Sequence, residues 1–325
     1  MGKKNKQFLV AYALCVFILP LFLGNNYHLM VLNVAALNMI IVIGLNLLMG
    51  YAGQVSLGHA AFFGMGAYLS GVLTTTYGFP VWPTTILAAL VTGGVAYLLG
   101  IPTLKLEGHY LVMATLGFNV IVYIVMIQLD RVTGGPSGFA GIPPLHVGKF
   151  VFNSDRKVYY LLGTVSVGIL VLAFNLTHSR VGRAMAALSH NEIAARCSGI
   201  DTEKYKINIF VLSAVLASLA GSFYAHYITF ISPGSFSIFY SLQVVTMVLI
   251  GGMGSLWGSI FGTFLLTILP EFLHAVKEYN VLIYGTILMA VLIFFPQGLF
   301  PGILEVWKKR RTRMEAESSG PGRGL

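Results

Sequence analysis

The distribution of charged residues constrains this chain more than any other feature of its sequence. No Asp, Glu, Lys or Arg occurs between Lys6 and Lys105, a run of 98 positions. Four more charge-free runs follow: 108–129 (22 residues), 158–179 (22), 207–270 (64) and 279–304 (26). Because a membrane-crossing helix needs about 20 apolar residues, the five runs have room for about ten crossings. The pattern predicts an all-α polytopic membrane protein with about ten transmembrane helices.

Composition excludes the main alternatives to a membrane protein. Of the 325 residues, 56% are hydrophobic and only 10% are charged, and the mean hydropathy is +0.80. A soluble protein carries about 25% charged residues, so a chain with this few could not cover a water-facing surface. An intrinsically disordered protein would be far less hydrophobic. The sequence therefore excludes both classes.

Glycine and proline divide the long runs into individual crossings. The third and eighth expected crossings lie beside the Gly-rich segments GYAGQVSLGHAAFFGMG and IGGMGSLWGSIFG, so we expect these helices to be short or broken. The expected crossings are Phe8–Gly24, His28–Gly50, Leu57–Gly78, Val81–Pro102, Tyr110–Gln128, Val158–Leu176, Ile207–Phe230, Phe239–Gly254, Leu256–Val276 and Val281–Phe300.

Lys and Arg predict the orientation of the chain. With ten crossings, the N-terminal segment, Lys105, the loop 177–206 and the C-terminal tail share one side and hold 15 of the 20 basic residues. Cytoplasmic loops carry the excess of Lys and Arg, so both termini are predicted to be cytoplasmic. The net charge of +9 is then mainly a topology signal rather than a sign of nucleic-acid binding. We expect one transmembrane domain over residues 1–304 and a disordered basic tail over 305–325, which could also touch anionic lipid headgroups.

The loop 129–157 is predicted to be external and is rich in Gly and Pro. Its length allows it to fold over the mouth of the helices as a lid or a docking surface, although a passive connector is the alternative. It contains the string Gly-Pro-Ser-Gly at 135–138, which matches a serine-nucleophile pattern. Pro136 stands beside Ser137 and no helix is expected to hold a histidine against it, so an intramembrane protease is a remote alternative.

The cytoplasmic loop 177–206 is predicted to contain a short helix near His190–Ser198. Ser189 followed three residues later by Glu192 is a capping box, in which each side chain bonds a free amide of the first turn. Gly199 is suited to the left-handed residue that ends a helix, and Asp201 or Thr202 can cap the helix that follows. The small residues Ala194 and Ala195 in the middle would let another protein approach closely.

The spacing Glu192-x-Ala194-Ala195-x-x-x-Gly199 resembles the coupling-helix motif of permeases in bacterial ATP-driven importers. Three other segments carry a closer resemblance: GLNLLMGYAGQVSLGHAAFFGMGAYLSG (44–71), TGGPSGFAGIPP (133–144) and LIGGMGSLWGSIFGTFL (249–265). Together they resemble the branched-chain amino acid permease family, LivM type, over about residues 40–300.

This resemblance implies an ABC importer permease fold in the bacterial inner membrane. It further implies a second, related permease (usually a different chain), two cytoplasmic ATPase subunits and a periplasmic binding protein that delivers branched-chain amino acids. The chain itself has no phosphate-binding loop of the form G-x-x-x-x-G-K-[ST], so an ATPase must be a separate chain. No cofactor is expected. The coupling residues that the resemblance indicates are Ser189, Glu192, Ala194, Ala195, Arg196 and Gly199.

The substrate pathway is harder to predict from the residues. No acidic or basic residue lies deep in an expected crossing, which argues against a proton relay and thus against a secondary transporter, the main rival class. Urea or short amides are alternative solutes for a permease of this fold. The isolated His226 and His274 are interpreted as structural, and no catalytic or metal-binding residue is expected. Candidate pathway residues are Asn46, Gln54, Ser56, His59 and Asn119, although such groups more often bond between helices.

Overall fold

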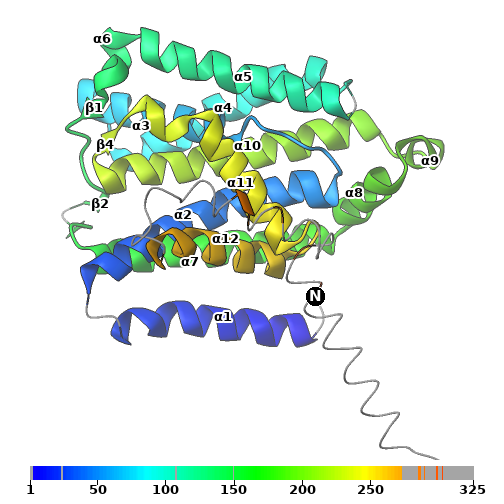
Figure 1. Cartoon of the computed structure of the whole chain (residues 1–325), viewed down its shortest axis with the longest axis horizontal. Helices are drawn as coiled ribbons and strands as arrows, with labels where there is room; N and C mark the ends of the chain where they lie inside the picture. Colours follow the sequence, from blue (N-terminus) through cyan, green and yellow to red (C-terminus); the bar gives the residue numbers. More distant parts are fainter. Residues whose placement is uncertain are drawn as a thin grey trace, which may run out of the picture.

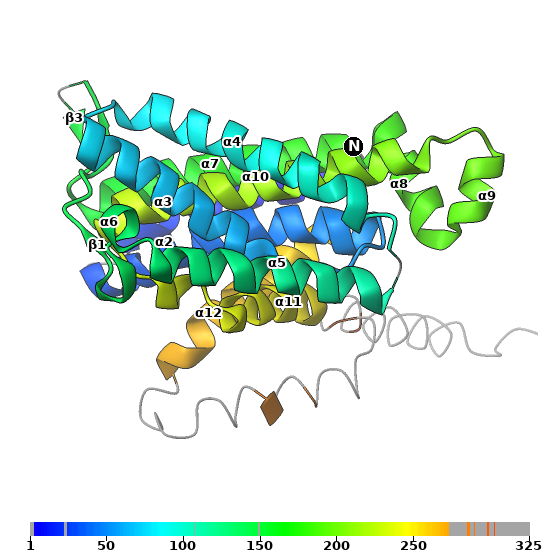
Figure 2. The same cartoon turned by 90° about the horizontal axis from the view of Figure 1, so that it is seen from above.

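The computed structural model describes residues 3–22, 25–106, 108–148 and 150–272, together with 285–286, 289, 298 and 302. Long helices running roughly parallel to one another form a bundle (Figures 1 and 2). In chain order the helices are α1 (Lys3–Phe22), α2 (Asn26–Asn46), the π-helix η1 (Leu47–Tyr51), α3 (His59–Tyr77), α4 (Val81–Thr103), α5 (His109–Gln128), α6 (Asp130–Thr133), the 3-10 helix η2 (Gly135–Ser137), α7 (Asp155–Thr177), α8 (Arg180–His190), α9 (Glu192–Cys197), α10 (Thr202–Ile228), the 3-10 helix η3 (Pro233–Phe236), α11 (Ile238–Gly251) and α12 (Leu256–Phe272).

Helix α2 forms the centre of the bundle. Every residue from Ala35 to Asn46 is buried, and α7, α10, α11 and α12 pack around it. A helix that is apolar on all sides suits either a core position or a lipid-facing one, and α2 takes the core position. Helix α5 lies at the periphery, where most of its side chains stay outside the protein core.

Helix α10 packs closely along α3 and α4 because small residues line the contact. A Cβ on Gly221 would clash with the carbonyl of Phe63, and a Cβ on Gly66 would clash with that of Ser218. At the same crossing Ser222 Oγ donates to the Gly66 carbonyl at 3.1 Å. Close approach of backbones through small residues is the usual means of helix association in a membrane.

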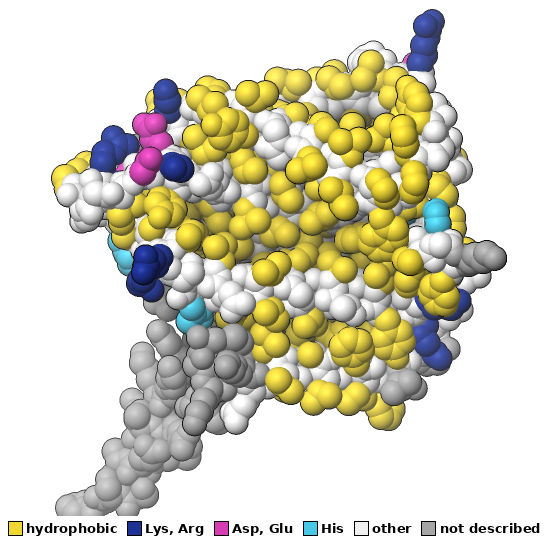
Figure 3. All heavy atoms as spheres, turned by 180° about the vertical axis from the view of Figure 1, so that it is seen from behind, with side chains coloured by type: hydrophobic (Ala, Val, Ile, Leu, Met, Phe, Trp, Pro, Cys, Tyr) yellow, Lys and Arg dark blue, Asp and Glu magenta, His cyan; other side chains and the backbone are white. Residues whose placement is uncertain are grey.

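The two ends of the bundle differ. At one end lie two short antiparallel pairs, β1 (Phe139–Ala140) with β4 (Phe230–Ile231) and β2 (His146–Val147) with β3 (Phe150–Val151). At the other end, called the α9 end below, helices α8 and α9 project beyond the long helices (Figure 1). Figure 3 shows charged side chains gathered at the two ends and a broad apolar surface between them. That distribution suits a chain whose middle faces lipid.

Five of the described helical segments are long and apolar enough to cross a membrane: Asn26–Tyr51, Val81–Thr103, His109–Gln128, Asp155–Thr177 and Thr202–Ile228. Each coincides with an expected crossing. Helix α3 spans 19 residues without belonging to this group, and α1, α11 and α12 contain shorter apolar segments. The expected crossing Val281–Phe300 and the tail 305–325 lie outside the described residues, apart from isolated positions. The total of about ten crossings therefore stays a prediction.

The loop 129–157 is folded onto its end of the bundle. Strand β1 pairs with β4, so the loop is joined by backbone hydrogen bonds to the segment that follows α10. Trp82 Nε1 donates to the carbonyl of His146 at 2.7 Å, and His226 Nδ1 bonds the carbonyl of Pro143 at 2.8 Å. These contacts hold the loop against α4 and α10, and whether it acts as a lid or a docking surface remains a prediction.

Candidate functional site

Helices α8 and α9 form the segment in which we expected the coupling helix, but the capping is different. Asn191, and not Ser189, begins α9: its side chain accepts a hydrogen bond from the Ala194 amide at 3.0 Å. Ser189 still belongs to α8, and its hydroxyl donates to the carbonyl of Ala186 at 2.9 Å. The capping-box prediction was therefore wrong. The physical reason is that Asn191 has an extended backbone (φ −159°, ψ 110°), so that α8 ends and α9 begins two residues later than expected.

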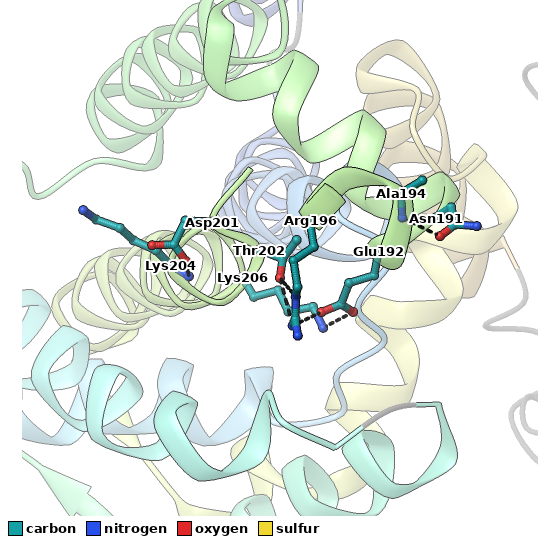
Figure 4. Close-up of polar contacts among 8 residues, drawn as sticks. All are labelled: Asn191, Glu192, Ala194, Arg196, Asp201, Thr202, Lys204 and Lys206. Atoms are coloured by element: carbon teal, nitrogen blue, oxygen red, sulfur yellow. Dashed lines mark hydrogen bonds and ion pairs between the residues drawn. The ribbon is translucent and has the colours of Figure 1, made fainter. Parts of the chain in front are cut away.

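Glu192 bonds other helical elements instead of reaching back to a cap residue. One carboxylate oxygen forms an ion pair with Lys206 of α10, and the other lies 3.3 Å from Arg196 Nη2 (Figure 4). Arg196 also donates to Thr202 Oγ1, from Nε at 3.3 Å and from Nη2 at 3.2 Å. The side chain of Lys206 is only 9% exposed and that of Glu192 is 24% exposed. These contacts join α9 to the first turns of α10.

The end of α9 and the start of α10 agree with the sequence prediction. Gly199 has a left-handed backbone (φ +80°), and the Ile200 amide donates to the Ala195 carbonyl at 3.1 Å. A residue with a side chain would be strained at this φ, which explains the glycine. Asp201 Oδ1 then accepts from the Lys204 amide at 3.1 Å and caps α10. Helix α9 is thus capped at both ends and continues directly into a long helix.

The two alanines of α9 face opposite ways. Ala195 is buried against the bundle, whereas Ala194 is exposed. Of the two alanines, only Ala194 therefore lies where another protein could approach, and its contact with a partner stays a prediction. Ile193 beside it is 77% exposed and Cys197 is also exposed. The exposed surface of α9 thus combines the apolar Ile193, Ala194 and Cys197 with the charged Arg196, whose side chain is 61% exposed, and this mixture suits contact with another protein.

Asn46 has a structural environment. Its Nδ2 donates to the Ser255 carbonyl at 2.9 Å and to Ser259 Oγ at 2.6 Å, and its Oδ1 accepts from the Gly254 amide at 2.9 Å. Asn46 therefore attaches the turn between α11 and α12 to the end of α2. Both hydrogens of its amide nitrogen are donated in these contacts, and its oxygen accepts one of the two hydrogen bonds that it could accept.

Three of the other candidate pathway residues surround the break between η1 and α3. Asn119 Nδ2 on α5 donates to the Leu57 carbonyl at 3.3 Å, and Ser56 Oγ accepts from the Gly58 amide at 3.3 Å. His59 Nε2 lies 2.6 Å from Ser213 Oγ of α10. Each of the three side chains is at most 1% exposed. The structure thus brings them together as a buried polar cluster around non-helical backbone, which such backbone requires at membrane depth.

Gln54 is separate from this cluster. It faces a cavity at the α9 end of the bundle, beside Ser189 and the Glu192–Lys206 ion pair.

Sequence reasoning missed several residues that complete these arrangements. The sequence indicates Lys206 only as a positive charge that helps to set the orientation in the membrane. It gives no sign of Thr115 and Ser241, whose hydroxyls accept from the Leu57 and Ala60 amides at the break. Their partners lie 14 to 181 residues away, so no local pattern indicates them. Asn191 is different, because Asn is as good an N-cap as Ser and stands directly before Glu192.

Among the described residues, neither Ser137 nor His226 has contacts that indicate catalysis or metal binding. Ser137 is exposed in η2, and among the described residues it has no hydrogen bond to a histidine. Both ring nitrogens of His226 are bonded, to the Pro143 carbonyl and, at 2.7 Å, to Ser70 Oγ, which confirms a structural histidine. Over the described ranges no group of three His, Cys, Asp or Glu side chains could hold a metal ion. His274 lies outside these ranges.

Comparison with known proteins identifies the family. A family model described as the permease component of the branched-chain amino acid transport system matches residues 27–293. The chain is 33% identical to the high-affinity branched-chain amino acid transport permease LivM of Escherichia coli, over 92% of this chain and 75% of that protein. It is 25% identical to BraD of Pseudomonas aeruginosa, a permease of the same named system, over 82% of this chain and 92% of that protein.

Another relative is named for a different solute. The autoinducer 2 import permease LsrC of Salmonella paratyphi B is 29% identical over 86% of this chain and 82% of that protein. No solved structure matches. The relatives are transport permeases, in agreement with the apolar parallel helices and with the α9 segment. The chain belongs to the branched-chain amino acid permease family, as a multi-pass permease subunit of LivM type.

Proposed function

We propose that this chain is one permease subunit of an ATP-driven ABC importer that moves branched-chain and other hydrophobic amino acids into the cell. It lies in the bacterial inner membrane with both termini and the α9 end cytoplasmic. The excess of basic residues on that side supports this orientation. Family membership supports the transport role, and the printed function of the LivM and BraD relatives supports the solute class.

The attachment of α9 is the observation that carries the proposal. A helix that transmits motion must be rigidly joined to the element it moves. Here α9 is capped by Asn191, ended by Gly199 and joined to α10 through Glu192 and Lys206. Its outer surface, formed by Ile193, Ala194 and Cys197, is left to bind an ATPase subunit. Movement of the ATPase would then be passed to α10 and from there to α3 and α4.

Family membership, together with the absence of a phosphate-binding loop from this sequence, supports the following partners. Two cytoplasmic ATPase subunits supply ATP hydrolysis, because this sequence contains no phosphate-binding loop. A second homologous permease, as a heterodimer partner, completes the transmembrane pathway. A periplasmic binding protein delivers the solute to the end that carries the β-strands, where the ordered loop 129–157 offers a surface.

The solute class depends on the relatives rather than on a visible binding site. Within the described part of this chain, Ser56, His59 and Asn119 are buried and hydrogen-bonded, so a pathway lined by them would have to open during the transport cycle. Urea or a short amide remains an alternative solute. The autoinducer 2 relative favours testing a small polar, non-amino-acid solute as well.

Two measurements test the proposal. Mass spectrometry of the complex purified in mild detergent should find two ATPase subunits and a second permease. The isolated chain moving solute down an ion gradient would instead establish a secondary transporter. In vesicles that contain the complete complex, ATP-dependent uptake of leucine should exceed uptake of urea and of autoinducer 2.

Two variants test the coupling role of α9. Glu192→Lys places a positive charge against Lys206, and Gly199→Pro cannot adopt the positive φ, so both should abolish ATP-coupled uptake while the protein still inserts. Glu203→Lys, with the same charge change at an exposed position, is the matched control and should transport normally. Normal uptake by Glu192→Lys and Gly199→Pro would remove the coupling role from α9.

A further inference from the structure

A cavity of about 150 Å³ lies at the α9 end of the bundle. Three segments far apart in the sequence enclose it: the break after η1, the link between α4 and α5, and the α8–α9 corner. The cavity is therefore bounded on one side by the Glu192–Lys206 ion pair. Its lining includes none of the buried cluster residues Ser56, His59 and Asn119. It also includes none of the exposed α9 residues Ile193, Ala194 and Cys197.

One wall of the cavity is polar and incompletely bonded. Gln54 is only 5% exposed, yet neither its Nε2 nor its Oε1 has a hydrogen-bond partner among the described residues. Ser189 donates its proton to Ala186 and keeps an oxygen that can accept. Lys206 has three donor hydrogens, and Glu192 does not use all of them. Buried polar atoms normally find partners, so an unpartnered primary amide in a cavity points to a ligand.

Leucine side chains form the apolar part of the lining. Leu104, Leu111 and Leu188 are buried there, and the exposed Leu106 forms the rim. A cavity of this size holds a small hydrocarbon such as benzene, which matches a short branched aliphatic group. The site thus combines an aliphatic wall with a wall of hydrogen-bonding and charged groups.

An aliphatic α-amino acid carries the complementary chemistry. Its carboxylate and ammonium groups are attached to the same carbon, so a single primary amide can donate to one and accept from the other. The Lys206 ammonium favours the carboxylate, and Ser189 Oγ and the Glu192 carboxylate favour the ammonium. The side chain of the amino acid would lie against the leucine wall.

We propose that this cavity is a binding site for an aliphatic α-amino acid from the cytoplasm, separate from the transport pathway. The inference rests on the proposed function, since the ligand is then the transported product. A bound amino acid contacts the two residues that join α9 to α10, and it therefore favours one position of the coupling helix. Accumulated product would slow further import through this site.

Equilibrium binding of radiolabelled leucine tests the site directly. The complete complex is placed in lipid nanodiscs without the periplasmic binding protein and without ATP. Leu106→Trp fills the rim of the cavity, and Gln54→Leu removes both hydrogen-bonding atoms. Leu98→Trp, at a 69% exposed position on α4 that does not line the cavity, is the matched control.

We expect saturable binding by the wild type at millimolar leucine, competition by valine, and a loss of about tenfold or more in affinity in both cavity variants. Leu98→Trp should bind as the wild type does. Absence of saturable binding by the wild type, or unchanged affinity in both cavity variants, would overturn the proposal and indicate a site for water only.

Uptake assays separate this inference from the proposed function. Proteoliposomes preloaded with leucine should import it more slowly than empty ones, and Leu106→Trp should remove that difference. Leucine uptake without leucine binding at the cavity would overturn the site and leave the transport function standing. Failure of the wild type to import leucine would overturn the proposed solute, whatever the binding result.

Discussion

The ion pair between Glu192 and Lys206 predicts an asymmetry between its two partners. Replacing Glu192 by Gln leaves the Lys206 ammonium in a site that is only 9% exposed, with no other ion-pair partner among the residues that the structure describes. Replacing Lys206 by Met leaves a carboxylate that is 24% exposed and still lies 3.3 Å from Arg196. The first change should therefore destabilise the docked position of α9 more than the second.

The expected magnitudes follow from burial. Removing one partner of a fully buried pair costs about 3–5 kcal/mol. Because Glu192 is partly exposed, we expect about 2–3 kcal/mol for Glu192→Gln. Lys206→Met leaves Glu192 paired with the exposed Arg196, so a cost of about 1 kcal/mol is expected. The double variant should resemble Lys206→Met, since neither change then leaves an unpaired ammonium in the buried site.

Hydrogen exchange of the amides of residues 192–200 measures this docking in the intact complex. Each factor of ten corresponds to about 1.4 kcal/mol, so exchange should accelerate about 30- to 150-fold in Glu192→Gln and about fivefold in Lys206→Met. Peptides from α2 report on the bundle core and should be unaffected in both variants. Equal acceleration in the two single variants, or a larger effect of Lys206→Met, would refute the assignment of a buried ammonium that depends on Glu192.

Five other substitutions have defined outcomes. Asn191→Ala should destabilise α9 by about 1 kcal/mol, which is measured as faster amide exchange, whereas Ser189→Ala should have little effect on that exchange. A larger effect of Ser189→Ala would instead support the capping box of Ser189 and Glu192. Gly199→Ala should lower ATP-coupled uptake partially, because a positive φ costs a residue with a side chain about 1–2 kcal/mol; full activity would contradict this. Asn46→Ala should lower the thermal stability of the complex by about 1–3 kcal/mol, since it leaves the part-buried Gly254 amide without its partner and detaches the α11–α12 turn from α2, and a melting curve identical to the wild type's would be inconsistent with that role. Ser137→Ala should transport normally, and abolished turnover would revive an enzymatic role.

The long helices were predictable because their signal is the absence of charge. Each of the five apolar segments that could cross a membrane lies at an expected crossing. The break before α3 was also indicated by its Gly-rich sequence. Both features depend on local composition, which can be determined from a single sequence.

The polar contacts were not predictable in the same way. Asn46, His59 and Asn119 were singled out as polar residues in apolar surroundings, but their partners come from α10, α11 and the α11–α12 turn. In a membrane a buried polar side chain takes its partner from whichever helix packs beside it. Packing is a tertiary property, so the sequence indicated which residues needed partners without indicating which residues supply them.

The pattern E-x-A-A-x-x-x-G in α9 has a physical explanation in this fold. Glu192 bonds Lys206, Ala195 packs against the bundle, and Gly199 provides the left-handed turn into α10. Three of the four fixed positions therefore serve to attach a short helix to a long one. Of the four fixed positions, Ala194 and Gly199 are exposed, and Ala194 directly follows the exposed Ile193. For the proposed coupling role, the choice of ATPase would then depend mainly on positions that the pattern leaves free, above all Ile193. Glu192 and Gly199 would pass a force on α9 to α10.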